Sequence, residues 1–134
     1  MHSSEYCRSN CPINFALETL GDRWTLLIVR DLLFKGKRTY GEFLDSQEGI
    51  STSILADRLR RLKDHGVVTT DAADDKRSIL YRLTPKGLDL LPAMLELTAW
   101  SAKYDSRTNA PENFALTLRE QRLQLMDSIL SKLK

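Results

Sequence analysis

The chain has 134 residues, a hydrophobic fraction of 42% and a formal net charge of +2, from 20 basic and 18 acidic residues. This length predicts one domain whose core needs no disulfide or metal support. No apolar run approaches the roughly 18 residues of a membrane-spanning helix, and the N-terminus lacks the apolar segment of a secretion signal. We therefore expect a cytoplasmic protein with reduced thiols. Affinity for a polyanion must come from local clusters of cations, because the whole chain is nearly neutral.

Two helices are predicted in the first quarter of the chain. The first covers residues 12–20, with Pro12 in its first turn and Gly21 at its end. Asp22 is the candidate cap of the second, over residues 23–34. The centre of this second helix is apolar almost all round, which is typical of a helix surrounded by protein.

A helix-turn-helix is predicted next. Thr39 and Glu42 have the spacing of a capping box at the start of a short helix. After a turn, Ser51 can accept a hydrogen bond from the first turn of a second helix. Gly66 can end that helix in the left-handed conformation, which residues with a Cβ avoid.

The second helix of this motif has two unlike faces. Its apolar residues cluster on one side at the 3.6-residue period: Ile54, Leu55, Leu59 and Leu62. The opposite side carries small groups near its start and charged groups further on: Ser53, Ala56, Asp57 and Arg60, with Thr52 and Lys63 at the edge. Small hydroxyl side chains leave room for a helix to enter a DNA major groove end-first, and they still form hydrogen bonds.

Two strands are predicted after the motif, over residues 67–72 and 78–83, joined by the polar linker 73–77. The second strand alternates its apolar side chains to one face: Ile79, Tyr81 and Leu83. A helix-turn-helix followed by such a hairpin is a winged helix-turn-helix. The predicted fold class is therefore mainly α with a small β-hairpin wing (α+β).

Two further helices are predicted outside the winged core. Thr84 and Pro85 open a long helix that reaches Tyr104, and Pro111 opens a last helix that runs nearly to Lys134. Leucines recur at helical spacing in both, and a small domain rarely covers so much apolar surface on peripheral helices. We expect them to be flanking dimerisation helices of a homodimer.

The chain resembles the HxlR-type transcriptional regulators over residues 11–108. The resemblance lies in the order and spacing of several segments: Cys11-Pro12, residues 20–28, 36–43, 49–51, Leu55 with residues 58–62, 66–68 and 81–87. Members of this family are dimeric bacterial winged-helix proteins that repress or activate nearby promoters. The resemblance implies a DNA-binding domain over residues 11–108. Residues 109–134 lie beyond it and are predicted from periodicity alone to form a C-terminal dimerisation helix.

The sequence departs from the family pattern at two positions and in the wing. Thr39 stands where an arginine is usual, and Lys63 stands where a glutamate is usual. The wing sequence Asp75-Lys76-Arg77 is more similar to that of the MarR family, which shares the winged-helix plan.

Candidate contacts to base edges lie on the polar face of the second helix of the motif: Thr52, Ser53, Ala56 and Arg60. Arg60 can bind guanine through two hydrogen bonds, and Ala56 can pack on a thymine methyl. The alternative is a solvated helix face. Ser51 is first a helix cap, and a phosphate contact is compatible with that role.

Other candidates would contact the DNA backbone. Thr39 and Tyr40 lie where the first helix of the motif crosses the phosphates, although Tyr40 is equally plausible as a core residue. Lys76 and Arg77 lie at the wing tip, where cations meet a minor groove or phosphates; the alternative is that they are solvated loop charges.

Arg58 and Asp57, two charged residues beside the candidate base-contacting residues, each have several interpretations. For Arg58 a structural ion pair is at least as plausible as a DNA contact. Asp57 accepts a hydrogen bond from cytosine, orients Arg60 or Arg61, or faces water.

The two cysteines are candidates for redox sensing. Cys11 directly precedes a helix, whose dipole favours a thiolate. The resemblance implies the same role, because some HxlR-type members use the cysteine at this position to sense oxidants or electrophiles. One hypothesis is that Cys11, with Cys7 or a thiol of the partner subunit, changes DNA affinity; the alternative is a semi-buried thiol in the dimer interface. No metal site is predicted, because Cys7, Cys11 and His2 lack a fourth ligand.

The predicted function is a DNA-binding transcriptional regulator that acts as a homodimer on an inverted repeat and responds to a thiol reagent or a small-molecule ligand. The alternative is a winged-helix protein-interaction module without DNA binding. An enzyme is not expected, because no nucleophile or carboxylate pair gathers near His2 or His65, and no phosphate loop or metal motif is present. The expected partners are double-stranded DNA, a second copy of the chain and an oxidant or small-molecule effector, without a cofactor.

Overall fold

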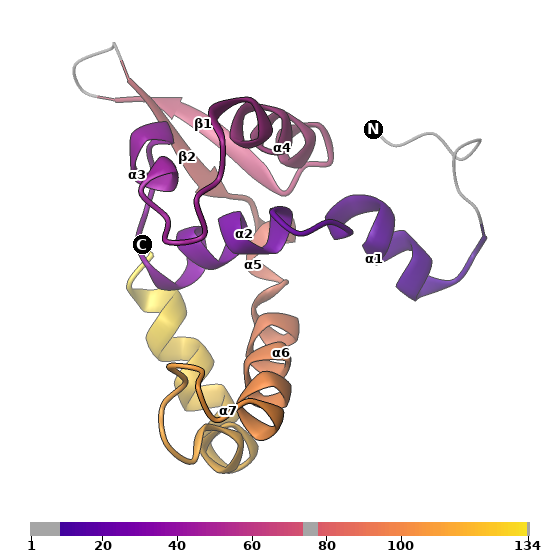
Figure 1. The fold of residues 1–134 in the computed structure, drawn as a ribbon, viewed down its shortest axis with the longest axis vertical. Coiled ribbons are helices and arrows are strands. Elements are labelled where there is room, and N and C mark those ends of the chain that lie inside the picture. Colours follow the sequence, from indigo (N-terminus) through magenta and orange to yellow (C-terminus); the bar gives the residue numbers. More distant parts are fainter. Residues whose placement is uncertain (1–8, 74–77, 134) are drawn as a thin grey trace. The chain divides into compact units, whose positions relative to one another are not determined.

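The structure is a computed structural model that describes residues 9–73 and 78–133. Its elements in chain order are shown in Figure 1: α1 (Pro12–Leu20), α2 (Thr25–Phe34), α3 (Tyr40–Leu44), α4 (Thr52–Asp64), β1 (Val68–Ala72), β2 (Ile79–Leu83), α5 (Pro85–Leu88), α6 (Leu91–Tyr104) and α7 (Phe114–Ser131). The chain divides into two compact units, residues 1–87 and 88–134. Among the described helices, none combines the length and the apolar character that crossing a membrane requires.

The core of the first unit is built from the apolar faces of α2, α4 and the hairpin. From α2 it takes Ile28, Val29, Leu32 and Leu33, and from α4 it takes Leu55, Leu59 and Leu62. Phe43 of α3 is also buried, and its ring meets Tyr81 of β2 edge-on at a centroid distance of 5.9 Å. The buried leucines of α4 recur at the predicted helical period, so the face predicted to be apolar is the face that packs.

Local side-chain caps begin the helices of the motif as predicted. The Thr39 hydroxyl accepts a hydrogen bond from the Glu42 amide at 3.2 Å, and the Glu42 carboxylate accepts one from the Thr39 amide at 3.0 Å. The Ser51 hydroxyl accepts one from the Ile54 amide at 3.3 Å at the start of α4. These bonds satisfy amides that have no partner within a helix.

The start of α2 and the end of α4 also depend on the residues that flank each helix. The Asp22 carboxylate accepts hydrogen bonds from the amides of Trp24 and Thr25 at 2.7 and 3.0 Å, as a cap does, but the residue at the N-cap position of α2 is Trp24. The helix itself begins at Thr25, two residues later than predicted. Beyond α4, Gly66 adopts a φ of +74°, the left-handed conformation that only glycine adopts without strain.

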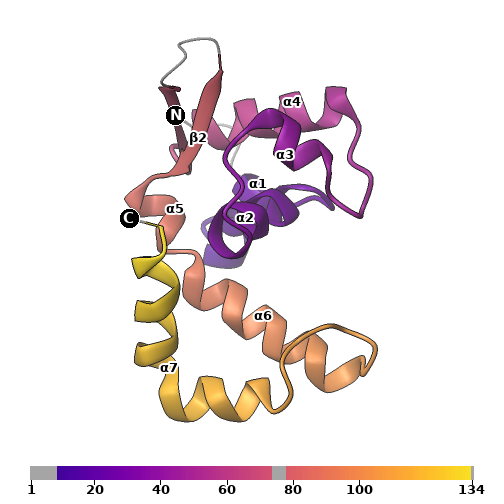
Figure 2. The same cartoon turned by 90° about the vertical axis from the view of Figure 1, so that its left-hand side faces the viewer.

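The two strands pair antiparallel, with Val68 opposite Leu83 and Ala72 opposite Ile79. Figures 1 and 2 show the hairpin beside α4. The predicted alternation fades along β2, because Leu83 is buried, Tyr81 is half-buried and Ile79 is 54% exposed. The buried end of the hairpin packs on the helices, and the other end leads to the wing tip.

The predicted continuous helix from Pro85 to Tyr104 is wrong. The structure has a short helix, α5, that ends at Leu88, and a new helix, α6, that starts at Leu91. Pro92 explains the break, because proline has no amide hydrogen and its ring would clash with the carbonyl of residue 88 in a continuous helix. In the first turn of α6 the same proline is tolerated.

The second unit consists mainly of α6 and α7, which pack on each other (Figure 2). The last helix begins at Phe114 rather than at the predicted Pro111, because residue 113 interrupts the helical backbone. Asn113 adopts a left-handed φ of 58°, and the Phe114 amide closes a turn onto the Pro111 carbonyl at 3.1 Å. A second irregularity, a non-helical backbone at Gln121, divides α7 into two segments.

Candidate nucleic-acid interface

The polar face of α4 is exposed, as predicted. The side chains of Thr52, Ser53 and Ala56 lie on this face together with Arg60, whose side chain is 63% exposed. Ser51 and Ser53 come within 3.5 Å of each other through their hydroxyl oxygens at its start. The structure therefore brings the four candidate base-contacting residues onto one accessible surface, above a buried row of leucines that holds the helix in place.

Arg60 is held on this face by carboxylates of its own helix. Its Nη2 donates to Asp57 Oδ1 at 2.5 Å, and its Nη1 lies 3.6 Å from Asp64 Oδ2. Asp57 also accepts a hydrogen bond from Arg58 Nη1 at 2.5 Å. Hydrogen bonds from Arg60, and then from Arg58, lower the pKa of Asp57. Of the interpretations open for Asp57, orientation of Arg60 is the one observed.

Arg58 links α4 to the beginning of α2. Its Nε lies 3.2 Å from Asp22 Oδ1, and its side chain is 21% exposed. Burial alone would raise the pKa of Asp22, but hydrogen bonds from Thr25 and Trp24, together with the nearby Arg58 guanidinium, outweigh it and lower the pKa. The ion pair considered as an alternative for Arg58 is therefore present.

The hydroxyl groups of Thr39 and Tyr40 already have protein partners. Thr39 Oγ1 belongs to the capping box, and it also donates to Glu42 Oε1 at 3.1 Å. Tyr40 is half-buried, and its hydroxyl donates to the Thr52 carbonyl at 2.8 Å. Tyr40 thus ties α3 to the first turn of α4, a role that neither of the two sequence interpretations described. A phosphate contact by either hydroxyl must share or replace these hydrogen bonds.

A buried carboxylate anchors the turn between α3 and α4. Asp31 of α2 is 1% exposed and accepts hydrogen bonds from Ser46 Oγ at 2.8 Å and from Arg30 Nη2 at 2.8 Å. Lys37 Nζ lies 3.7 Å from the same carboxylate. Arg30 also bonds Glu48, with its Nη1 2.7 Å from Glu48 Oε2. These contacts therefore tie the turn to α2 at two points, Ser46 and Glu48.

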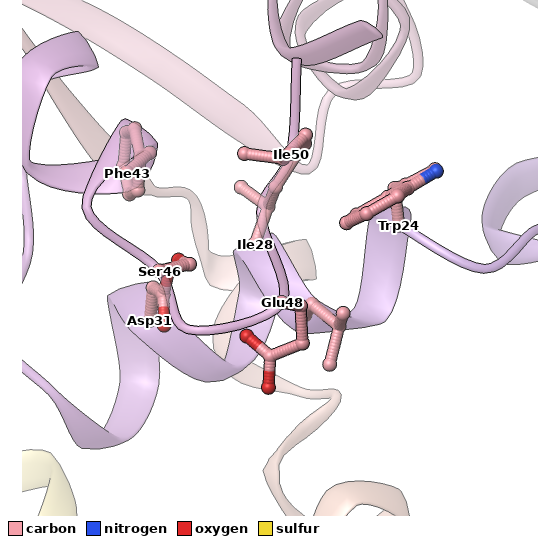
Figure 3. Close-up of a pocket in the computed structure, with 8 residues that line it drawn as sticks. Trp24, Ile28, Asp31, Phe43, Ser46, Glu48 and Ile50 are labelled. Atoms are coloured by element: carbon pink, nitrogen blue, oxygen red, sulfur yellow. The ribbon is translucent and has the colours of Figure 1, made fainter.

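Figure 3 shows Asp31 and Ser46 facing each other beside a small pocket between α2 and this turn. The pocket is lined by Trp24, Leu27, Ile28, Asp31, Phe43, Ser46, Glu48 and Ile50. Hydrogen bonds from Arg30 lower the pKa of Glu48 to about 2. This cluster was not predicted from the sequence, although the charged pair Arg30-Asp31 within a largely apolar helix was a visible signal.

The sequence pattern of the HxlR-like helix-turn-helix family matches residues 19–109. The chain belongs to this family. An uncharacterized HTH-type transcriptional regulator of Synechocystis is 35% identical over 88 residues, which are 65% of this chain and 64% of that protein. The match thus spans somewhat less than two thirds of the relative's length.

Two solved structures show the same fold. The crystal structure of PA1607, a candidate transcription factor, has a TM-score of 0.69 and 37% identity, over 82% of this HxlR-like chain and 74% of that one. The redox regulator HypR in its oxidized form has a TM-score of 0.64 and 26% identity, over 71% and 98% of the two chains. The winged helix-turn-helix predicted from the sequence is therefore the fold of this HxlR-like protein.

The other basic residues of the HxlR-like domain differ in their exposure and partners. Lys35 and Arg38 are exposed, whereas Lys37 faces the buried Asp31. Lys63 Nζ donates to Thr70 Oγ1 of β1 at 3.0 Å and so ties the exposed face of α4 to the hairpin. The predicted wing contacts, Lys76 and Arg77, lie outside the described residues.

Of the two cysteines, the structure describes Cys11 alone, and Cys7 lies outside the described residues. Cys11 is a free, exposed thiol at the residue that precedes α1. Within residues 9–73 and 78–133, no group of three histidine, cysteine, aspartate or glutamate side chains is arranged to hold a metal ion.

Proposed function

We propose that this HxlR-like protein is a cytoplasmic, sequence-specific DNA-binding transcriptional regulator without enzymatic activity. The observation that carries the proposal is the exposed face of α4, where small side chains near the helix start are followed by Arg60. This arrangement suits a helix that enters a major groove with its N-terminal part. The names of its relatives, which are transcriptional regulators, support the same function.

The proposed roles divide between bases and backbone. Thr52, Ser53, Ala56 and Arg60 contact base edges, and Arg60 binds guanine through two nitrogens. The backbone contacts come from the helix-turn-helix and from the wing: Ser51, Thr39, Tyr40, Lys76 and Arg77. Such contacts orient the protein without carrying sequence information.

The acting species is proposed to be a homodimer on an inverted repeat. Large apolar side chains are exposed in each unit, among them Ile13 and Leu17 of α1 and Trp100 and Tyr104 of α6. Exposed apolar patches of this kind mark association surfaces. Two copies related by a twofold axis would present two α4 helices to successive major grooves, about 34 Å apart.

We also propose a thiol response centred on Cys11, with Cys7 or a partner-subunit thiol as the second group. The exposed position of Cys11 before α1 makes its thiol accessible, and the related HypR is a redox regulator. The test is the pH dependence of Cys11 alkylation in a Cys7→Ser background. A Cys11 that titrates below the range of a free thiol supports the proposal, and one that titrates like a free thiol overturns it.

Duplex binding tests the central proposal. A footprint on the DNA that flanks this protein's own gene, with and without oxidant, would locate the operator. Affinity for that duplex is expected to fall with salt, with a log–log slope of roughly −0.9 for each neutralised phosphate. A protein-interaction module that retained the fold would bind no duplex at any salt concentration, and that result would refute the proposal.

Paired substitutions test the division of roles. Arg60→Ala is expected to cost about 1–3 kcal/mol of binding free energy and to relax the preference at one base position. Lys76→Ala is expected to weaken all duplexes alike and to reduce the salt slope by about one. Equilibrium binding to the operator and to single-base variants of it measures both effects. Unchanged affinity and preference in Arg60→Ala would remove Arg60 from the interface.

A further inference from the structure

We propose that Asp57 is a specificity-determining residue of α4, because it holds Arg60 in a fixed orientation and opposes its attraction to phosphates. This inference rests on the proposed DNA-binding function and assigns a role that goes beyond it. In this view Asp57 makes Arg60 a reader of a base edge rather than a general cation. The carboxylate itself need not touch DNA.

The carboxylate of Asp57 is bound through both of its oxygens. Asp57 Oδ1 accepts from Arg60 Nη2, and Asp57 Oδ2 accepts from Arg58 Nη1, both at 2.5 Å. Because each oxygen is bound to a different arginine, the carboxylate cannot rotate without losing one of the two hydrogen bonds. Hydrogen bonds between two ionised groups are stronger than those between neutral groups.

Arg58 is itself paired with a carboxylate outside α4. Its Nε lies 3.2 Å from Asp22 Oδ1, and only 21% of its side chain is exposed. Asp22 in turn accepts hydrogen bonds from the amides of Trp24 and Thr25 at the start of α2. The exposed Arg60 is therefore connected, through Asp57 and Arg58, to a helix of the core. A long arginine side chain at the surface otherwise samples many rotamers, and ordering it on DNA costs entropy.

The negative charge of Asp57 affects a base contact and a phosphate contact of Arg60 differently. A guanidinium has five N–H donors in a planar fork, so Arg60 can keep its bond to Asp57 and still offer donors to guanine O6 and N7. A phosphate is different, because the negative charge of Asp57 repels it and partly cancels the gain from Arg60. Binding to an unrelated duplex depends mostly on such phosphate contacts. Specificity is a difference between two affinities, and a repulsive element that weakens the wrong complex increases it.

Asp64 provides a matched control, because its carboxylate also lies beside Arg60. Asp64 Oδ2 lies 3.6 Å from Arg60 Nη1 and its side chain is 63% exposed, against 38% for Asp57. Asp64 thus places a similar charge beside Arg60 without a short hydrogen bond. Asp57→Asn and Asp64→Asn remove the same charge from one helix, and they differ in whether the network to α2 is broken.

The experiment uses the full chain and a selected duplex. A random-sequence pool of duplexes is enriched on the wild-type protein. The dissociation constants of wild type, Asp57→Asn and Asp64→Asn are then measured for the best duplex and for a scrambled duplex of equal composition, over a range of salt. We expect Asp57→Asn to bind the scrambled duplex about threefold to tenfold more tightly and to lose about tenfold in discrimination. Asp64→Asn is expected to change discrimination by less than about threefold.

A second variant separates geometry from charge. Asp57→Glu keeps the negative charge but moves it by one methylene, so its affinity for the scrambled duplex is expected to stay near wild type. Its preference at the base read by Arg60 is expected to relax. Equal effects of Asp57→Asn and Asp64→Asn, or unchanged discrimination in both Asp57 variants, would overturn the inference while duplex binding by the wild type keeps the proposed function intact. A wild-type protein that enriches no duplex would refute both.

Discussion

At the scale of single residues, Gly87 illustrates how tightly the hairpin joins α5. A Cβ at this position would lie 2.3 Å from the Val67 carbonyl oxygen and 2.8 Å from a Leu83 methyl carbon. The Gly87 amide donates to Thr84 Oγ1 at 3.2 Å, and the Thr84 amide donates to the Val67 carbonyl at 3.0 Å. The backbone of Gly87 is thus held against a carbonyl that cannot move away without breaking the junction.

We predict that Gly87→Ala lowers the free energy of unfolding by about 1–3 kcal/mol, because the added methyl group overpacks a buried junction. Urea unfolding followed by circular dichroism measures the change. Gly41→Ala is the matched control: Gly41 lies in α3, and nothing lies within 4 Å of the place that a methyl group would take there. Alanine at this position is therefore expected to be neutral or stabilising by up to about 1 kcal/mol. Equal stability of the Gly87 variant and wild type would contradict the overpacking.

Contacts between residues close in sequence could be predicted, whereas contacts between distant residues could not. The caps at Ser51 and Thr39 were predictable, since a cap joins residues two or three positions apart and its pattern is local. The links from Asp31 to Ser46 and from Asp22 to Arg58 were not, because they join residues 15 and 36 positions apart and need the packed fold. The polar face of α4 was predictable because its pattern is local. Orientation of Arg60 by Asp57, three positions away, was one of the interpretations that the sequence left open.

At the scale of elements, the Arg30–Glu48 pair fastens the turn between α3 and α4 to α2. The pKa of Glu48 is about 2 in the folded chain, below its ordinary value of 4.5. A depressed carboxylate pKa contributes stability that is fully present above the unfolded-state pKa and is lost as the pH falls through the folded-state value. The contribution of Glu48 is therefore present above about pH 4.5 and disappears towards pH 2.

We predict that Glu48→Gln costs no more than about 1 kcal/mol at pH 7, since the pair is partly exposed and screened by solvent. The difference in urea midpoint between wild type and variant is expected to shrink as the pH is lowered from 6 towards 3. Added salt is expected to shrink it at pH 7 as well. A difference that grows with acidification would show that Glu48 acts through something other than its charge.

The errors in element boundaries have identifiable causes. The apolar residues before and after residue 90 share one helical period, so the pattern alone predicts a single helix from residue 85 to residue 104. Pro92 breaks it, as the backbone of a continuous helix has no room for that ring. Likewise Pro111 marks a helix start in sequence, but the left-handed Asn113 delays α7 to Phe114.

At the scale of the whole molecule, the second unit leaves a stripe of large side chains uncovered. Leu97, Trp100 and Tyr104 of α6 are 48%, 65% and 68% exposed and recur at the spacing of one helix face. The ring centroids of Trp100 and Tyr104 lie 5.6 Å apart. Periodicity in the sequence did not distinguish these residues from core residues, because a core and a subunit interface require the same spacing. The single chain shows that the intramolecular core takes Leu91, Met94 and Leu95 instead.

We predict that Trp100→Glu converts a dimer into a monomer, because it places a charge in the centre of an apolar surface that would have to lose its water on association. Sedimentation velocity over a range of protein concentrations measures the change. Gln124→Glu, which adds the same charge at an exposed position of α7, is expected to leave the association intact.

Trp100→Glu also tests whether association of two copies increases the affinity for DNA. When two copies are joined, the second α4 meets its half-site as an intramolecular event, which raises overall affinity by about 10²–10⁴-fold without any new contact. Trp100→Glu is therefore expected to lose most of its affinity for an inverted repeat while its affinity for an isolated half-site stays that of wild type. A monomeric wild type, or a Trp100→Glu variant that still binds the inverted repeat as tightly as wild type, would mean that the exposed stripe of α6 is not what pairs the two α4 helices.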